Sequence, residues 1–205
     1  MPPGRKENTV FINIGKFKRA LKETYKSVTG VGVERNEKDV IAISAGRLYI
    51  EAHLMDTTKE FRGALIEILG DIPEKGEAIT YHEDGDQNAL TGSYDQSLLT
   101  YEKPGGTEYA ITKMIMDEEV LYQSDSGNVI MVKKALSDIF DLSKQESGEA
   151  APCNWKEMDG HIFLTNGVVA MRILPTREKY RGEADIIDAL KNVTLNYPRS
   201  NEELI

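Results

Sequence analysis

The chain has 205 residues, 40% of them hydrophobic, and a net charge of −9. This length suits one large or two small domains, which can fold without a disulfide or a metal. Cys153 is the only cysteine, which excludes an intrachain disulfide and a cysteine-based metal cluster. The N-terminal residues show no secretory pattern, and no apolar run reaches the length of a membrane span. We therefore expect a cytoplasmic protein without membrane contact.

The charge is unevenly distributed along the chain. Residues 1–38 hold 9 basic and 4 acidic residues, so the other 167 residues carry a balance of −14. A basic segment on an acidic body can face a polyanion while the rest stays soluble. The same pattern is also expected if a cationic helix simply packs against the acidic body of an ordinary globular protein.

The most informative segment is residues 10–28, after a tail at 1–9 that we expect to be disordered. A strand is predicted at 10–14 and a helix at 15–28. One helix face is apolar, with Phe17, Leu21, Tyr25 and Val28. The opposite face is basic, with Lys18, Arg19, Lys22 and Lys26. This face is the candidate for contact with a polyanion.

The next elements alternate between charged and apolar segments. Residues 34–39 are predicted to be a charged linker, and 39–53 a hairpin. An N-cap at 56–58 starts a helix that ends near Gly70. Residues 77–116 are predicted to form three or four antiparallel strands. The acidic segment 116–128 lacks periodicity and is predicted to connect a first domain (10–126) to a second (127–205).

The second domain repeats the plan of the first. A strand at 128–131, a helix at 132–144, strands within 155–174 and a helix at 178–193 are predicted. FKRAL at 17–21 matches VKKAL at 132–136, and FRGALIEIL at 61–69 matches YRGEADIIDAL at 180–190. The copies lie about 115–121 residues apart. We predict an α+β fold of two tandem units, each strand–helix–hairpin–helix, with antiparallel strands added to the first and the second truncated.

This plan resembles that of bacterial DNA sliding clamps, the β subunit of the replicative polymerase. The resemblance rests mainly on residues 98–175: a closing strand pair and acidic link (98–120), a strand and helix (128–144), and a turn region, DGHIFLTNGVVAMRILP (159–175). It covers about two-thirds of the chain at low identity. It implies that the basic helix faces double-stranded DNA, that polymerase or other replication proteins are partners, and that several copies form a ring, hence a homo-oligomer.

The family's turn region borders a groove that binds partner peptides. The matching residues here are Thr165, Gly167, Val168 and Val169, which are therefore the candidate partner-binding residues. This chain departs from the family in several ways: it has no third domain, the helix at 132–144 has a mixed-charge face, and two further differences concern the turn and the second copy. Valines replace the polar His and Arg of the turn, and the second copy lacks the strand-rich half. A truncated clamp relative from a phage or mobile element fits this pattern.

Other sites find little support in the sequence. His53, His82 and His161 have no metal-ligand spacing. The segment 84–95 imitates a calcium loop, but Ala89 stands where that loop needs glycine. No catalytic constellation, cofactor motif or metal site emerges, so we expect no enzyme activity and no cofactor. The alternative to DNA contact is a protein–protein interaction module on the same scaffold.

Overall fold

The structure, a computed structural model, describes residues 12–85, 87–89, 98–100, 106–140, 155–158, 160–165, 168–176 and 181–195. The helices are α1 (Ile14–Tyr25), α2 (Lys59–Leu69), α3 (Lys134–Ser137) and α4 (Arg181–Leu190), with the 3₁₀ turns η1 (Leu54–Asp56) and η2 (Leu98–Thr100). The strands are β1 (Val31–Arg35), β2 (Val40–Ala45), β3 (Leu48–His53), β4 (Glu77–Tyr81), β5 (Gln87–Ala89), β6 (Thr107–Met116), β7 (Glu119–Ser124), β8 (Val129–Lys133), β9 (Trp155–Met158), β10 (His161–Thr165) and β11 (Val169–Ile173).

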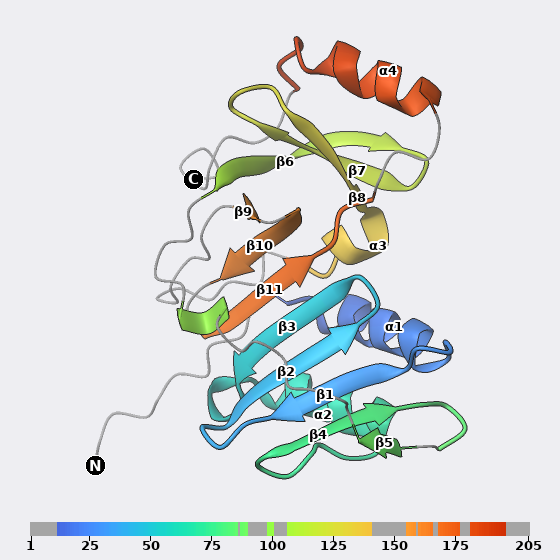
Figure 1. Cartoon of the computed structure of the whole chain (residues 1–205), viewed down its shortest axis with the longest axis vertical. Helices are drawn as coiled ribbons and strands as arrows, with labels where there is room; N and C mark the ends of the chain where they lie inside the picture. The colour runs from blue at the N-terminus through green and yellow to red at the C-terminus, as the bar shows by residue number, and fades with distance from the viewer. Residues whose placement is uncertain are drawn as a thin grey trace.

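The described strands form one sheet in the order β5-β4-β1-β2-β3-β11-β10-β9-β6-β7-β8, with antiparallel pairing throughout. Figure 1 shows α1 and α2 against the lower part of this sheet and α4 at the top. The α+β class predicted from the sequence is confirmed. The strands of the second half extend the sheet of the first half, because β11 pairs directly with β3.

Two hairpins at the centre of the sheet repeat with the same register. In the hairpin β2–β3, Ile41 pairs with Ala52. In β10–β11, Ile162 pairs with Ile173, each residue 121 positions later. The remaining pairs of β10–β11 follow the same offset, which lies within the expected spacing of the repeat.

The pairing between these hairpins is itself symmetric. Leu48 pairs with Ile173, and Ala52 pairs with Val169. Val169 and Ile173 are the equivalents of Leu48 and Ala52, 121 positions later, so the two pairs are equivalent to each other. The third pair, Ile50–Met171, joins two residues that are themselves equivalent. The four strands are thus related by a local two-fold axis near Ile50 and Met171. The helix–three strands–helix order also occurs twice, as α1–β1β2β3–α2 and α3–β9β10β11–α4.

The first two helices are positioned by caps and by an apolar interface. The Asn13 side chain accepts a hydrogen bond from the Lys16 N–H, and Thr58 accepts one from the Phe61 N–H. The rings of Phe17 and Phe61 stack with their centroids 5.0 Å apart. Both rings are fully buried in the main core cluster, together with Ile50 and residues of the second half such as Met171. This core fixes the direction in which the polar side of α1 faces.

The helix α4 does not repeat the position of α2. Ile187 of α4 packs with Leu121, Val129 and Met131, which form a cluster separate from the main core. The buried amide of Gln123 holds the chain just after α4. It donates to the carbonyls of Leu190 (3.3 Å) and Val193 (2.8 Å) and accepts from the Leu195 N–H (2.9 Å). Strands β7 and β8, which contribute to this cluster, have no counterpart among the described residues of the first repeat.

Several element predictions were wrong. Residue Ile12 forms only an isolated bridge with Phe140, so the described part of 10–14 is not a strand. The supposed linker at 34–39 contains the end of β1, and the acidic connection at 116–128 contains the fully buried strand β7. Val28 lies beyond the end of α1 and is 97% exposed. Within the described residues the helix expected at 132–144 is the short α3; residues 141–144 and the tail at 1–9 lie outside them.

Candidate nucleic-acid interface

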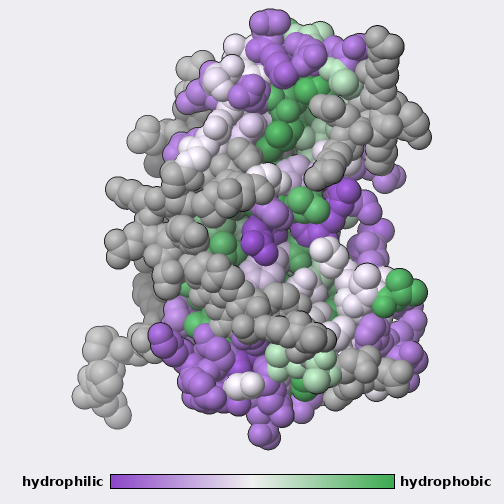
Figure 2. All heavy atoms as spheres, in the orientation of Figure 1, coloured by the Kyte–Doolittle hydropathy of each residue, from purple (hydrophilic) through white to green (hydrophobic). Residues whose placement is uncertain are grey.

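The basic side of α1 faces outward, opposite its buried residues. Phe17, Ala20 and Leu21 are buried, whereas the side-chain exposure of the predicted cations ranges from 31% at Lys18 to 73% at Arg19. Lys22 and Lys26 are exposed at 54% and 63%. The predicted DNA-binding residues therefore lie together on one solvent-facing side of the helix. Figure 2 shows hydrophilic side chains at both ends of the face in view and in its middle, beside a smaller number of hydrophobic ones.

Glu67 of α2 contacts two of these cations. The Lys18 ammonium donates to one carboxylate oxygen of Glu67, and the Lys22 ammonium lies 3.7 Å from the other. These contacts, led by the Lys18 hydrogen bond, hold the pKa of Glu67 below its ordinary value. Glu67 reaches them because the Phe17–Phe61 contact packs α1 against α2. The carboxylate stays charged and neutralises part of the basic face.

A second carboxylate comes from the turn after β4. The Glu83 carboxylate lies 3.5 Å from the Lys26 ammonium, and the Glu83 N–H donates to the Tyr25 carbonyl at 3.2 Å. The chain returns from α1 through Gly30, whose φ is +62°. A Cβ at Gly30 would lie 2.6 Å from the Tyr81 carbonyl oxygen, so the close approach of these segments needs glycine.

The remaining contacts of the face involve α1 itself and α3. Arg19 pairs with Glu23 one turn later, at 3.1 Å. Lys16, which sequence reasoning missed, lies 3.4 Å from Asp138, and Asp138 also accepts from Lys134. Burial tends to raise the pKa of Asp138, but Lys134 and Lys16 outweigh it and lower the pKa. Helical periodicity could have included Lys16, because it lies three residues before Arg19 and so at the edge of the basic side.

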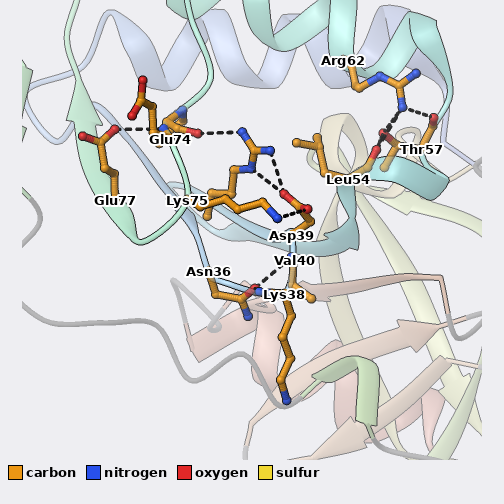
Figure 3. A network of polar contacts seen from close by, with 12 residues as sticks. Asn36, Lys38, Asp39, Val40, Leu54, Thr57, Arg62, Glu74, Lys75 and Glu77 are labelled. Carbon is orange, nitrogen blue, oxygen red and sulfur yellow. Dashed lines mark hydrogen bonds and ion pairs between the residues drawn. The ribbon is translucent and has the colours of Figure 1, made fainter.

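A separate polar network holds the β1–β2 turn (Figure 3). The Asp39 carboxylate accepts from the Arg35 guanidinium at 2.7 and 2.9 Å and pairs with the Lys75 ammonium at 2.5 Å. The Lys75 and Arg35 hydrogen bonds lower the pKa of Asp39. Arg35 also donates to the Pro73 carbonyl. These bonds join the turn to the segment after α2, so we assign the network a structural role.

A buried carboxylate lies on the opposite side of the central sheet. Glu51 is fully buried, and it accepts from the Tyr49 hydroxyl at 2.9 Å and from the Leu99 N–H of η2 at 3.3 Å. The Arg172 guanidinium lies 4.6 Å above the Tyr49 ring. Burial, followed by the nearby Glu51 charge, raises the pKa of Tyr49. The cluster ties η2 to the sheet where the two repeats meet.

Two of the four predicted partner-binding residues, Thr165 and Val169, are buried. The Thr165 hydroxyl donates to the Val169 carbonyl at 3.1 Å, and Val169 is fully buried in β11. Val168 is half-buried, and its carbonyl accepts from the His53 N–H. Gly167 lies outside the described residues. The side chains of Thr165 and Val169 are therefore not exposed in this structure.

Within the described part of the chain, no group of three or more His, Cys, Asp or Glu side chains could hold a metal ion. Cys153 and most of the calcium-like segment lie outside the described residues. None of the helices in the described ranges is long and apolar enough to cross a membrane.

No protein-family model, curated protein or solved structure matches this chain.

Proposed function

We propose that this protein is a non-catalytic, clamp-related protein that contacts double-stranded DNA through the basic side of α1. The observation that carries the proposal is the clustering of Lys18, Arg19, Lys22 and Lys26 on one exposed helix face of an otherwise acidic protein. The repeated order of strands and helices supports the comparison with clamps.

The mechanism is electrostatic and independent of DNA sequence. Lysine and arginine side chains on one face can contact successive phosphates of the backbone, and phosphate contacts position a protein on DNA without reading bases. The acidic remainder of the molecule repels the duplex, so the protein would be oriented with α1 toward it.

A protein–protein interaction module is the second candidate, and a specific observation favours it. Each of the four predicted cations has a carboxylate within the molecule: Glu67, Glu23 or Glu83. The face is therefore closer to neutral than the sequence alone indicates. A mixed-charge helix surface suits a replication protein or another protein partner with complementary charges.

The experiment is duplex DNA binding measured by fluorescence anisotropy across a range of salt concentrations. We expect the affinity of the wild-type chain to fall steeply as salt rises. The double substitution Lys22→Glu with Lys26→Glu should abolish binding, because it reverses two exposed charges at the centre and end of the face.

The control reverses two exposed lysines far from α1. Lys113 lies on β6 and Lys191 follows α4, at the other end of the molecule (Figure 1). Lys113→Glu with Lys191→Glu changes the net charge equally and should retain most of the binding. Equal loss in both double variants would show that only net charge matters. If the wild type does not bind duplex DNA at low salt, the DNA contact is excluded and the protein–protein interaction module remains as the candidate function.

A further inference from the structure

We propose that Glu67 and Glu83 act as built-in competitors for DNA, occupying the α1 cations until phosphates displace them. The inference rests on the proposed function and specifies how binding at this face is regulated.

The geometry places the competitors on the predicted binding residues. Glu67 spans Lys18 and Lys22 from the neighbouring helix, with one carboxylate oxygen directed to each. Glu83 reaches Lys26 from the turn after β4. Three of the four predicted cations are thus engaged by carboxylates that belong to other elements.

The positions of these carboxylates are fixed by the fold. The Phe17–Phe61 stack sets the spacing of α1 and α2 near Glu67. The hydrogen bond from the Glu83 N–H to the Tyr25 carbonyl sets the approach of the β4–β5 turn. Because the backbones are held, the carboxylates compete at a constant high local concentration.

The competition is reversible because the groups are exposed. The Glu67 and Glu83 side chains are 51% and 57% exposed, and ion pairs in such positions are weak. A row of phosphates offers several charges at once and can replace the carboxylates together. When a lysine leaves its carboxylate, that carboxylate attracts a salt cation. This uptake offsets part of the counterion release and makes the wild-type salt dependence shallower.

The test compares Glu67→Gln with Asp188→Asn in the full chain, using duplex DNA as the probe. Each substitution removes one negative charge and keeps the side-chain size. Asp188 is an exposed carboxylate that pairs with Lys191 at 2.6 Å, far from α1. We expect Glu67→Gln to bind DNA roughly two- to fivefold more tightly at low salt and with a steeper salt dependence. Asp188→Asn should bind like the wild type, and adding Glu83→Gln to Glu67→Gln should tighten binding again.

The outcomes separate this inference from the proposed function. If the wild type binds through Lys22 and Lys26 but Glu67→Gln binds no more tightly than Asp188→Asn, the competitor role is wrong and the DNA interface remains. If neither the wild type nor the Glu67→Gln, Glu83→Gln double variant binds DNA at low salt, the competitor role and the proposed DNA contact are both wrong. Binding by the double variant but not by the wild type would show that DNA does not displace the carboxylates, which contradicts both the displacement and the proposed function. Thermal unfolding of each variant confirms that it is folded.

Discussion

At the scale of single residues, Asp39 links backbone strain to acid sensitivity. Its φ is +61°, in the left-handed region, and its carboxylate is held by Arg35 and Lys75. These cations lower the pKa of Asp39 from the ordinary value of 3.8. A depressed folded-state pKa contributes stability above the ordinary value, and this contribution is lost as pH falls through the lower folded value. The β1–β2 turn should therefore weaken in acid.

We predict that Asp39→Asn is less stable than the wild type near neutral pH and that the difference disappears in acid. Asparagine tolerates the left-handed backbone but lacks the charge, so the substitution removes only the ion pairs. Urea midpoints measured from about pH 7 downward should start to converge near pH 3.8 and continue to converge as the pH falls through the lowered folded-state pKa. Asp125→Asn, at an exposed residue without an ion pair among the described residues, should track the wild type. A constant gap for Asp39→Asn would contradict the prediction.

For the ion pairs of Lys18, Lys22 and Lys26, residue patterns alone could predict only the lysine. Helical periodicity placed Lys18, Lys22 and Lys26 on an exposed face, and the structure places them there. Their partners Glu67 and Glu83 follow at a distance of more than 40 residues along the chain. Which acid meets which base depends on how α2 and the β4–β5 turn pack, and no local pattern carries that information. The same holds for Asp138 and Lys16.

At the scale of elements, the attachment of α4 depends on a glycine. Gly127 has a φ of +85°, and a Cβ there would lie 2.2 Å from the Lys191 carbonyl oxygen. Gly85 has nearly the same backbone, with a φ of +83°, but nothing within 4 Å of a Cβ. Substitutions at the two positions should therefore share the cost of backbone strain, and only the one at Gly127 should add a steric collision.

We predict that Gly85→Ala lowers the free energy of unfolding by about 1 kcal/mol, because alanine disfavours positive φ. Gly127→Ala should lower the free energy of unfolding by about 1–3 kcal/mol more than Gly85→Ala does, because its methyl group must push the end of α4 away from β7. Urea denaturation measures both losses. Hydrogen exchange should show increased opening of α4 only in Gly127→Ala, and equal losses in the two variants would contradict the steric role.

Elements with a clear local pattern were predictable, and a strand of mixed polar and apolar residues was not. The hairpin at 39–53 and the helix starting after Thr58 show clear patterns, and both are present. Strand β7, EVLYQS, has no alternation because β6 and β8 flank it while α3 and α4 contact its two faces. Its buried Glu119 is satisfied by the Thr176 hydroxyl at 2.9 Å. A polar residue with a distant partner made the strand resemble a loop.

At the scale of the whole molecule, one core connects the two repeats. The main cluster includes Phe17 and Ile50 from the first repeat and Ile162 and Met171 from the second. The sheet is continuous through the β3–β11 pair. The internal repeat was visible in the sequence, but the antiparallel pairing of its equivalent strands was not. Such pairing depends on complementary edges that come together only in the folded molecule.

We predict that Ile50→Ala destabilises both halves together, by about 2–5 kcal/mol, because it leaves a cavity at the junction. Trp155 is the only tryptophan and belongs to β9, so its fluorescence reports on the second half. The urea midpoint from fluorescence should shift as far as the midpoint from circular dichroism. Val28→Ala, at a residue that is 97% exposed, serves as the control and should change little. An unchanged fluorescence midpoint in Ile50→Ala would show that the halves unfold independently, as the domain boundary at 126–127 predicts.

The β3–β11 pair also has a consequence for biosynthesis. Strand β3 leaves the ribosome well before β11, which ends about 120 residues later; at ordinary elongation rates the delay is on the order of ten seconds. During this time the hydrogen-bonding edge of β3 has no partner in the nascent chain. An open edge of this kind can pair with a neighbouring chain on the same messenger RNA. Yield in the cell should therefore depend on the speed of translation as well as on the stability of the finished fold.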